Sequence, residues 1–136
     1  MLTENEVVAA MTVYLQKNNY NIVQSCATHQ KGVDIIATHA THHLYIEAKG
    51  GTSSKEESAR YGLAFDDNQI KTHVSRAVLQ SMLVLQDKPA GPKTKVGIAL
   101  PDTPGHRTLI DAIIKPIKSL GIKVFWVLCQ DVTLQP

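Results

Sequence analysis

The chain has 136 residues, 43% hydrophobic and 19% charged, with a formal net charge of +2 at pH 7. These values suit one globular domain over residues 1–136 and exclude both a disordered chain and an apolar run long enough to span a membrane. The charge is too small to predict nucleic-acid binding by itself. Because the N-terminus lacks a signal-peptide pattern, and Cys26 and Cys129 lie in apolar contexts without metal-ligand spacing, we expect a cytoplasmic protein with buried free thiols.

Hydrophobic spacing predicts one helix followed by three strands in the first part of the chain. Residues 3–18 carry apolar side chains at helical spacing, and Thr3 and Glu6 form a capping-box pattern at their start. Strands are predicted at residues 20–26, 33–38 and 43–48, the last two joined by a hairpin turn. We therefore expect an antiparallel meander after the first helix.

Helices and strands alternate in the remainder. A helix is predicted over about residues 67–85, a strand at 95–100, a helix at 106–120 that Pro116 should kink, and a last strand at 122–128. A strand–helix–strand unit needs a crossover, which makes its two strands parallel. The predicted fold class is α/β, with a mixed central sheet and helices on both faces.

Three ionisable residues stand in segments that read as buried strands. Asp34 lies at the start of one strand, and Glu47 and Lys49 lie at the end of the next. Buried charges are normally paired or bound to metal, because an unpaired one costs several kcal/mol. Glu47 and Lys49 are two residues apart and share a face, and the backbone carbonyl of Ala48 lies between them. Carboxylates on adjacent strands predict a site for Mg²⁺, or Mn²⁺, with Lys49 facing water or phosphate.

This pattern of an acid on one strand and Glu-x-Lys on the next resembles the PD-(D/E)xK nuclease superfamily, which has the restriction-endonuclease-like fold. The order of elements also resembles it, with an α-β-β-β-α-β core here extended by a further helix and strand. Val33 stands where the family often has proline. The resemblance implies that Asp34, Glu47 and Lys49 are catalytic and that Asp34, Glu47 and the Ala48 carbonyl hold the metal.

The resemblance implies further site residues on two helices. Many family members have a metal-site glutamate on the first helix, for which Glu6 is the candidate, although its capping role explains it equally well. Several have a glutamine on the helix after the third strand, here Gln69, which would orient substrate or metal-bound water. His73 lies one turn later and is assigned to nucleic-acid binding, while an exposed polar pair is the alternative for both.

Other polar residues are candidates for contact with nucleic acid. Lys31 precedes Asp34 and would meet a phosphate, unless it belongs to a simple polar turn. Residues 55–68 form a long polar connection, with a short helix capped by Ser53 or Ser54 expected inside it. We expect either a flap, with Arg60 on phosphate and Tyr61 stacking on a base, or a detour without function. The hairpin turn holds three histidines, which are expected to be solvent-exposed and far from the acids: His39, His42 and His43.

These patterns together predict a metal-dependent nuclease acting on DNA, with RNA left open as a substrate. A chain of this length leaves little room for a base-reading element, so structure-selective cleavage is expected over sequence-specific cleavage. One alternative is a catalytically silent nucleic-acid-binding or interaction module of the same fold. Another is an unrelated mixed α/β protein in which Asp34 and Lys49 form a structural ion pair. No membrane partner is expected, and a homodimer or a larger nuclease complex is compatible with the resemblance.

Overall fold

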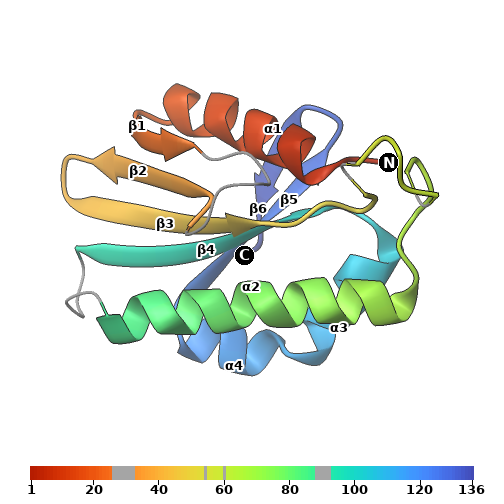
Figure 1. Ribbon diagram of the computed structural model, residues 1–136. Helices are drawn as coiled ribbons and strands as arrows, with labels where there is room; N and C mark the ends of the chain where they lie inside the picture. The colour runs from red at the N-terminus through yellow and green to blue at the C-terminus, as the bar shows by residue number, and fades with distance from the viewer. Residues whose placement is uncertain (26–32, 54, 60, 88–92) are drawn as a thin grey trace.

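A six-stranded mixed sheet runs through the molecule, and its strands lie side by side in chain order (Figure 1). The computed structural model describes residues 1–25, 33–53, 55–59, 61–87 and 93–136. The first three strands form the predicted antiparallel meander, and β3, β4 and β5 are parallel. The strands are β1 (Asn21–Ser25), β2 (Ile35–His39), β3 (His42–Ala48), β4 (Thr94–Pro101), β5 (Ile122–Leu128) and β6 (Asp131–Leu134).

Helices cover both faces of this sheet, as predicted (Figure 1). On one face α1 (Glu4–Lys17) packs Met11 and Leu15 into a core with the inward side chains of β2 and β3. On the other face α2 (Asp67–Asp87), α3 (Pro104–Ala112) and α4 (Ile114–Ser119) enclose a second core around Trp126. Alternation along β3 sends Ile46 to the α1 face, and Glu47 therefore faces the α2 side.

The predicted helix over residues 106–120 is two helices, and Pro116 is the physical reason. A proline inside a helix clashes with the carbonyl four residues earlier and has no N–H to donate. The chain ends α3 at Ala112 and begins α4 after Ile113, which serves as cap to both helices. Pro116 thereby falls in the first turn of α4, where its missing N–H has no helical partner to lose.

The sequence prediction missed β6, and the hairpin that β6 forms with β5 leaves one cysteine exposed. Leu128 and Asp131 form the last pair of the β5–β6 hairpin, and the turn between them holds Cys129 at a φ of 55°. Cys129 is exposed, so the expectation that it is a buried thiol was wrong. Cys26 lies outside the described residues.

Between β3 and α2 the described part of the chain forms turns, and the short helix expected there is absent from residues 55–59 and 61–66. The N–H of Ser58 donates to the carbonyl of Lys55, and Ser53 forms an isolated bridge with Tyr61. Neither Ser53 nor the described neighbours of Ser54 begin a helix. None of the helices in the described ranges has the length and apolar character that a membrane crossing requires.

Candidate functional site

The register of β2 and β3 brings Asp34 and Glu47 together. Ile35 pairs with Ile46 in this antiparallel ladder, so one further step places Asp34, just before β2, opposite Glu47. Directly opposed residues in an antiparallel pair point to the same face of the sheet. Asp34 is only 5% exposed, although it is a carboxylate at the end of a strand. The two acids predicted from sequence therefore lie on one face.

Two short hydrogen bonds fix these side chains. The Oδ2 atom of Asp34 accepts from the backbone N–H of Ala48 at 2.7 Å, which ties the acid to the neighbouring strand. The Nζ atom of Lys49 donates to Oε1 of Glu47 at 2.9 Å, so the ion pair in this cluster is between Lys49 and Glu47. The Oε2 atom of Glu47 is buried and has no hydrogen-bond partner among the described residues. A buried oxygen without a partner costs about 1–3 kcal/mol, and more when it is charged.

The first helix contributes Glu4 to this cluster, whereas the side chain of Glu6 is engaged in the cap of the helix. The carboxylate of Glu6 is exposed and accepts hydrogen bonds from the backbone N–H of Thr3, at 2.7 Å, and from its hydroxyl, at 3.0 Å. Glu6 thus completes the capping box of α1. Glu4, one residue into the helix, interacts electrostatically with Asp34, Glu47 and Lys49.

Close packing of Gly50 explains why the start of α1 reaches the site. A Cβ atom on Gly50 would lie 2.5 Å from the backbone nitrogen of Glu4, so any larger residue there would push the helix away. The next residue, Gly51, donates its N–H to the carbonyl of Leu2 at 2.7 Å. The end of β3 and the beginning of α1 are therefore locked together, with Glu4 beside Lys49.

Burial raises the pKa of every carboxyl in the cluster, and neighbouring negative charge adds to this for Glu4 and Glu47. Desolvation by burial and the neighbouring acids raise the pKa of Glu4 to about 7, although Lys49 opposes this. The pKa of Glu47 is raised by burial and by Asp34, against the hydrogen bond from Lys49. Burial also raises the pKa of Asp34, against its bond to the Ala48 N–H. Burial lowers the pKa of Lys49, but Glu47, Glu4 and Asp34 outweigh it, so the net shift is upward.

A divalent cation fits this arrangement in charge and in donor chemistry. Three carboxylates face a single ammonium group, which leaves an excess of two negative charges when all are ionised. Mg²⁺ prefers oxygen ligands and commonly uses one or two carboxylates while keeping several waters. The described residues contain no group of three or more His, Cys, Asp or Glu side chains in metal-binding geometry. The donors present therefore fit a largely hydrated ion on Asp34 and Glu47 better than a fully protein-ligated one.

The side chain of Gln69 is engaged at the start of α2. Its Oε1 atom accepts from the N–H of Asp66 at 2.9 Å, and its own N–H donates to Oδ1 of Asp66 at 2.9 Å. This reciprocal pair is a capping box with Asp66 as the N-cap residue. The role of Gln69 in orienting substrate or metal-bound water stays a prediction.

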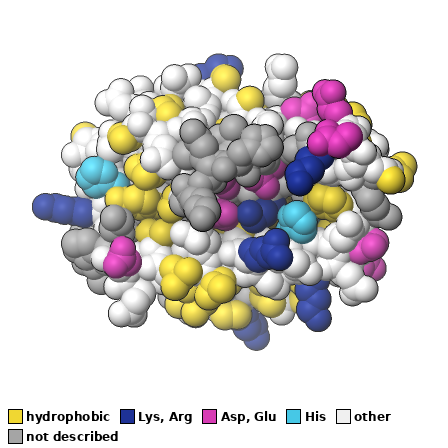
Figure 2. All heavy atoms as spheres, viewed as in Figure 1, with side chains coloured by type: hydrophobic (Ala, Val, Ile, Leu, Met, Phe, Trp, Pro, Cys, Tyr) yellow, Lys and Arg dark blue, Asp and Glu magenta, His cyan; other side chains and the backbone are white. Residues whose placement is uncertain are grey.

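His73 lies on the site side of α2. Its ring packs against Phe65, with centroids 4.6 Å apart. Burial, the charge of Lys49 and that of Arg76 lower the pKa of His73, so the imidazole lies within electrostatic range of the cluster. In Figure 2, acidic, basic and histidine side chains gather on this face beside α2. Contact of His73 with nucleic acid remains a prediction.

Sequence reasoning overlooked His106, which is buried next to His73. Its side chain is 1% exposed, and its Nδ1 atom lies 2.6 Å from the hydroxyl of Thr103, the N-cap of α3. Burial and the charge of His73 lower its pKa to about 4, so the imidazole is neutral at pH 7. The sequence signal that could have found it is the Thr-x-x-His spacing at the start of a helix.

The remaining nucleic-acid candidates are only partly described. Tyr61 is 46% exposed, which leaves its ring accessible. Lys31 and Arg60 lie outside the described residues, so the structure does not place them. The hairpin histidines differ from expectation: His39 and His42 are half-buried and stacked on each other, and Tyr20 bonds to Nε2 of His42 at 2.6 Å. Only His43 is exposed as predicted.

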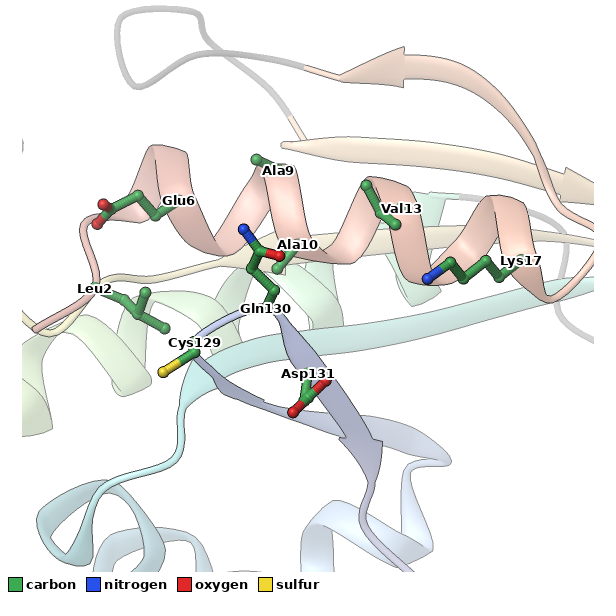
Figure 3. A pocket seen from close by; sticks show the side chains of 9 residues that line it. All are labelled: Leu2, Glu6, Ala9, Ala10, Val13, Lys17, Cys129, Gln130 and Asp131. Atoms are coloured by element: carbon green, nitrogen blue, oxygen red, sulfur yellow. The ribbon is translucent and has the colours of Figure 1, made fainter.

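A separate groove lies on the α1 side of the molecule. It has a volume of about 480 Å³ and runs between α1 and the β5–β6 turn (Figure 3). Glu6 and Lys17 lie along its helical side, and Cys129 lies at the turn. Asp34, Glu47 and Lys49 are not among the residues that line it, so this groove is distinct from the charged cluster.

Comparisons with known proteins do not assign the chain to a family. No protein-family model matches it, and no curated protein sequence does. Among solved structures, SfsA of Pyrococcus furiosus in complex with Ca²⁺ is similar, with 13% sequence identity and a TM-score of 0.39. The match covers 93% of this chain and 58% of that one, so the chain spans less than two thirds of that protein. A likeness at this level carries no argument about function, which must come from the site.

Proposed function

We propose that the protein is a metal-dependent nuclease of the PD-(D/E)xK type, with a restriction-endonuclease-like fold, that hydrolyses phosphodiester bonds of DNA. The observation that carries the proposal is the convergence of Asp34, Glu47 and Lys49 on one face. The bond from Ala48 to Asp34 and the ion pair of Lys49 with Glu47 hold them there. A hydrated Mg²⁺ or Mn²⁺ ion prefers oxygen donors of the kind that these residues supply.

Each residue of the cluster has a distinct role in the proposal. Asp34 and Glu47 hold the ion, and the Ala48 carbonyl adds a third oxygen. When bound, the ion supplies a water of lowered pKa and positive charge for the scissile phosphate. Lys49 presents its ammonium on the same face, where it stabilises negative charge that develops on the phosphate. Glu4, on α1, would add negative charge that favours a bound cation, because its carboxylate lies within electrostatic range of both acids.

The test is a cleavage assay on supercoiled, linear and branched DNA, each with Mg²⁺, with Mn²⁺ and with neither ion. The proposal predicts cleavage that needs the ion and that is greatest on branched DNA, since the chain has little room for a base-reading element. Glu47→Ala and Lys49→Ala should each reduce the rate by about 100-fold or more, as removal of a group that stabilises the transition state does.

Lys17→Ala is the matched control, because Lys17 is an exposed lysine on the groove side of α1. It should cleave as the parent does. Tight binding of DNA without cleavage in either ion would replace the proposal by the silent binding module. Cleavage that survives in Glu47→Ala would show that the chemistry lies elsewhere.

A further inference from the structure

The outer surface of α2 carries a stripe of exposed hydrophobic side chains. Leu79, Met82 and Leu83 are 57%, 45% and 52% exposed. They are spaced by three and four residues, so they lie next to one another on one face of the helix. Figure 2 shows hydrophobic side chains gathered over the middle of α2. Three large apolar side chains side by side on a helix are typical of a packing surface.

The polar residues that flank this stripe are arranged symmetrically. Arg76 and Asp87 lie along one side of it, whereas Ser75 and Gln86 lie in line with it beyond its two ends, and all four are exposed. The members of each pair are separated by about three helical turns, so both members of a pair point in nearly the same direction from the helix axis. The midpoint of each pair nearly coincides with that of Leu79 and Leu83. No ion pair of Arg76 or Asp87 with another described residue is present.

We infer that this stripe is the interface of a homodimer in which two copies of α2 pack antiparallel about a two-fold axis. A second copy rotated about the midpoint places Leu79 of one chain against Leu83 of the other. The same rotation places Arg76 opposite Asp87 of the second copy, and Ser75 opposite its Gln86. Each contact occurs twice, as a self-complementary interface requires. Opposite charges that flank an apolar helix seam set orientation in the same way in coiled coils.

The dimer has a consequence for the charged clusters of the two chains. A two-fold axis perpendicular to the helices keeps Arg76 of both copies on the same side of the interface. His73, which interacts electrostatically with Lys49, lies beyond Arg76 on that side. Both clusters would therefore open toward one side of the dimer, with the two His73 residues roughly 24 Å apart along the helix axes. The dimer itself does not depend on the proposed nuclease activity.

The test is the mass of the protein by sedimentation equilibrium or by light scattering, over a range of concentrations and without DNA. The parent should be a dimer at micromolar concentration, and Leu79→Lys/Leu83→Lys should be a monomer. Arg76→Asp and Asp87→Arg should each weaken dimerisation about tenfold or more, because each places like charges opposite one another. Combining the two exchanges should restore the affinity of the parent, because the attraction returns with its sign reversed.

Several outcomes would overturn the inference. A parent that stays monomeric at hundreds of micromolar would remove the interface, and a dimer that survives Leu79→Lys/Leu83→Lys would place it elsewhere. A dimer in which the combined charge exchange is no better than either single exchange would contradict the antiparallel register. Circular dichroism of each variant checks folding, and it should be unchanged because all the substituted side chains are exposed.

Discussion

A backbone contact holds one acid of the charged cluster, and a side-chain contact holds another. Asp34 is buried, and its raised pKa shows that desolvation outweighs the N–H of Ala48, which favours the ionised form. Glu47 shares one oxygen with Lys49 and buries the other without a partner among the described residues. A cation placed between them would relieve both costs, because it attracts both carboxylates and satisfies the unpaired oxygen.

Glu4 and Glu6 give a sharp comparison, because they lie two residues apart on α1 and differ in what they contact. Glu4→Gln should lower the rate of DNA cleavage by about 10- to 100-fold, the usual effect of losing a group that supports metal ligands. Glu6→Gln should leave the rate unchanged, because glutamine also completes a capping box. The measurement is the initial cleavage rate in Mg²⁺ for both variants. Equal rates for the two would remove Glu4 from the site.

The sequence predicted Asp34, Glu47 and Lys49 because the period of a strand decides which side chains share a face. It did not indicate Glu4, because the place of Glu4 depends on where α1 crosses the chain at Gly50. That crossing is a tertiary contact, and the spacing of apolar residues in α1 carries no information about it. The capping box of Thr3 and Glu6, which the sequence also predicted, is present in the structure.

At the scale of elements, α3 packs closely against α2 beside the site. A Cβ atom on Gly105 would lie 2.9 Å from the Cδ1 atom of Ile70, so the two helices touch closely there. His106 follows in the first turn of α3, with its Nε2 atom buried and unpartnered among the described residues. The neutral imidazole therefore packs as part of the core between the helices.

His106 should make the stability of the protein depend on pH. Its pKa of about 4 lies below the ordinary 6.5, so between these values the unfolded chain binds more protons than the folded one. The contribution of His106 to the free energy of unfolding should be fully present above about pH 6.5 and should fall as the pH drops toward 4. At about 1.4 kcal/mol per pKa unit, the loss amounts to at most about 3 kcal/mol.

The measurement is the free energy of unfolding by urea between pH 4 and 8, for the parent and for His106→Asn. The amide of asparagine keeps a partner for Thr103 but does not titrate, so this variant should lose that part of the pH dependence. His43→Asn replaces an exposed histidine and is the control. Parallel curves for the parent and His106→Asn would contradict the role of burial.

Elements that the sequence predicted are those with a strong internal pattern. Apolar periodicity located α1, α2 and the first five strands to within a few residues. The strand β6 was not predicted, because its residues Asp131–Leu134 are mostly exposed and are ordered by pairing with β5. The break before α4 was predicted only as a kink, because the position of a proline does not decide how the chain adapts to it.

At the scale of the whole molecule, the cluster depends on segments that are distant in the sequence. The start of α1, the start of β2, the end of β3 and the side of α2 converge at one end of the sheet (Figure 1). Parallel pairing of β3 with β4 fixes this end, since Ala48 pairs with Ala99 and the N–H of Lys49 donates to the Ala99 carbonyl at 3.0 Å. The cluster thus depends on the folded sheet. It could be proposed from the sequence because the order of the strands could be predicted.

The central claim is that Asp34 and Glu47 form one site for a divalent ion. Mn²⁺ binding tests this claim without reliance on cleavage. It is measured as the decrease in the electron paramagnetic resonance signal of unbound Mn²⁺. The parent should bind one Mn²⁺ per chain, Asp34→Asn/Glu47→Gln should bind it at least tenfold more weakly, and Glu6→Gln should bind it as the parent does. Equal Mn²⁺ binding by the parent and Asp34→Asn/Glu47→Gln would contradict the claim.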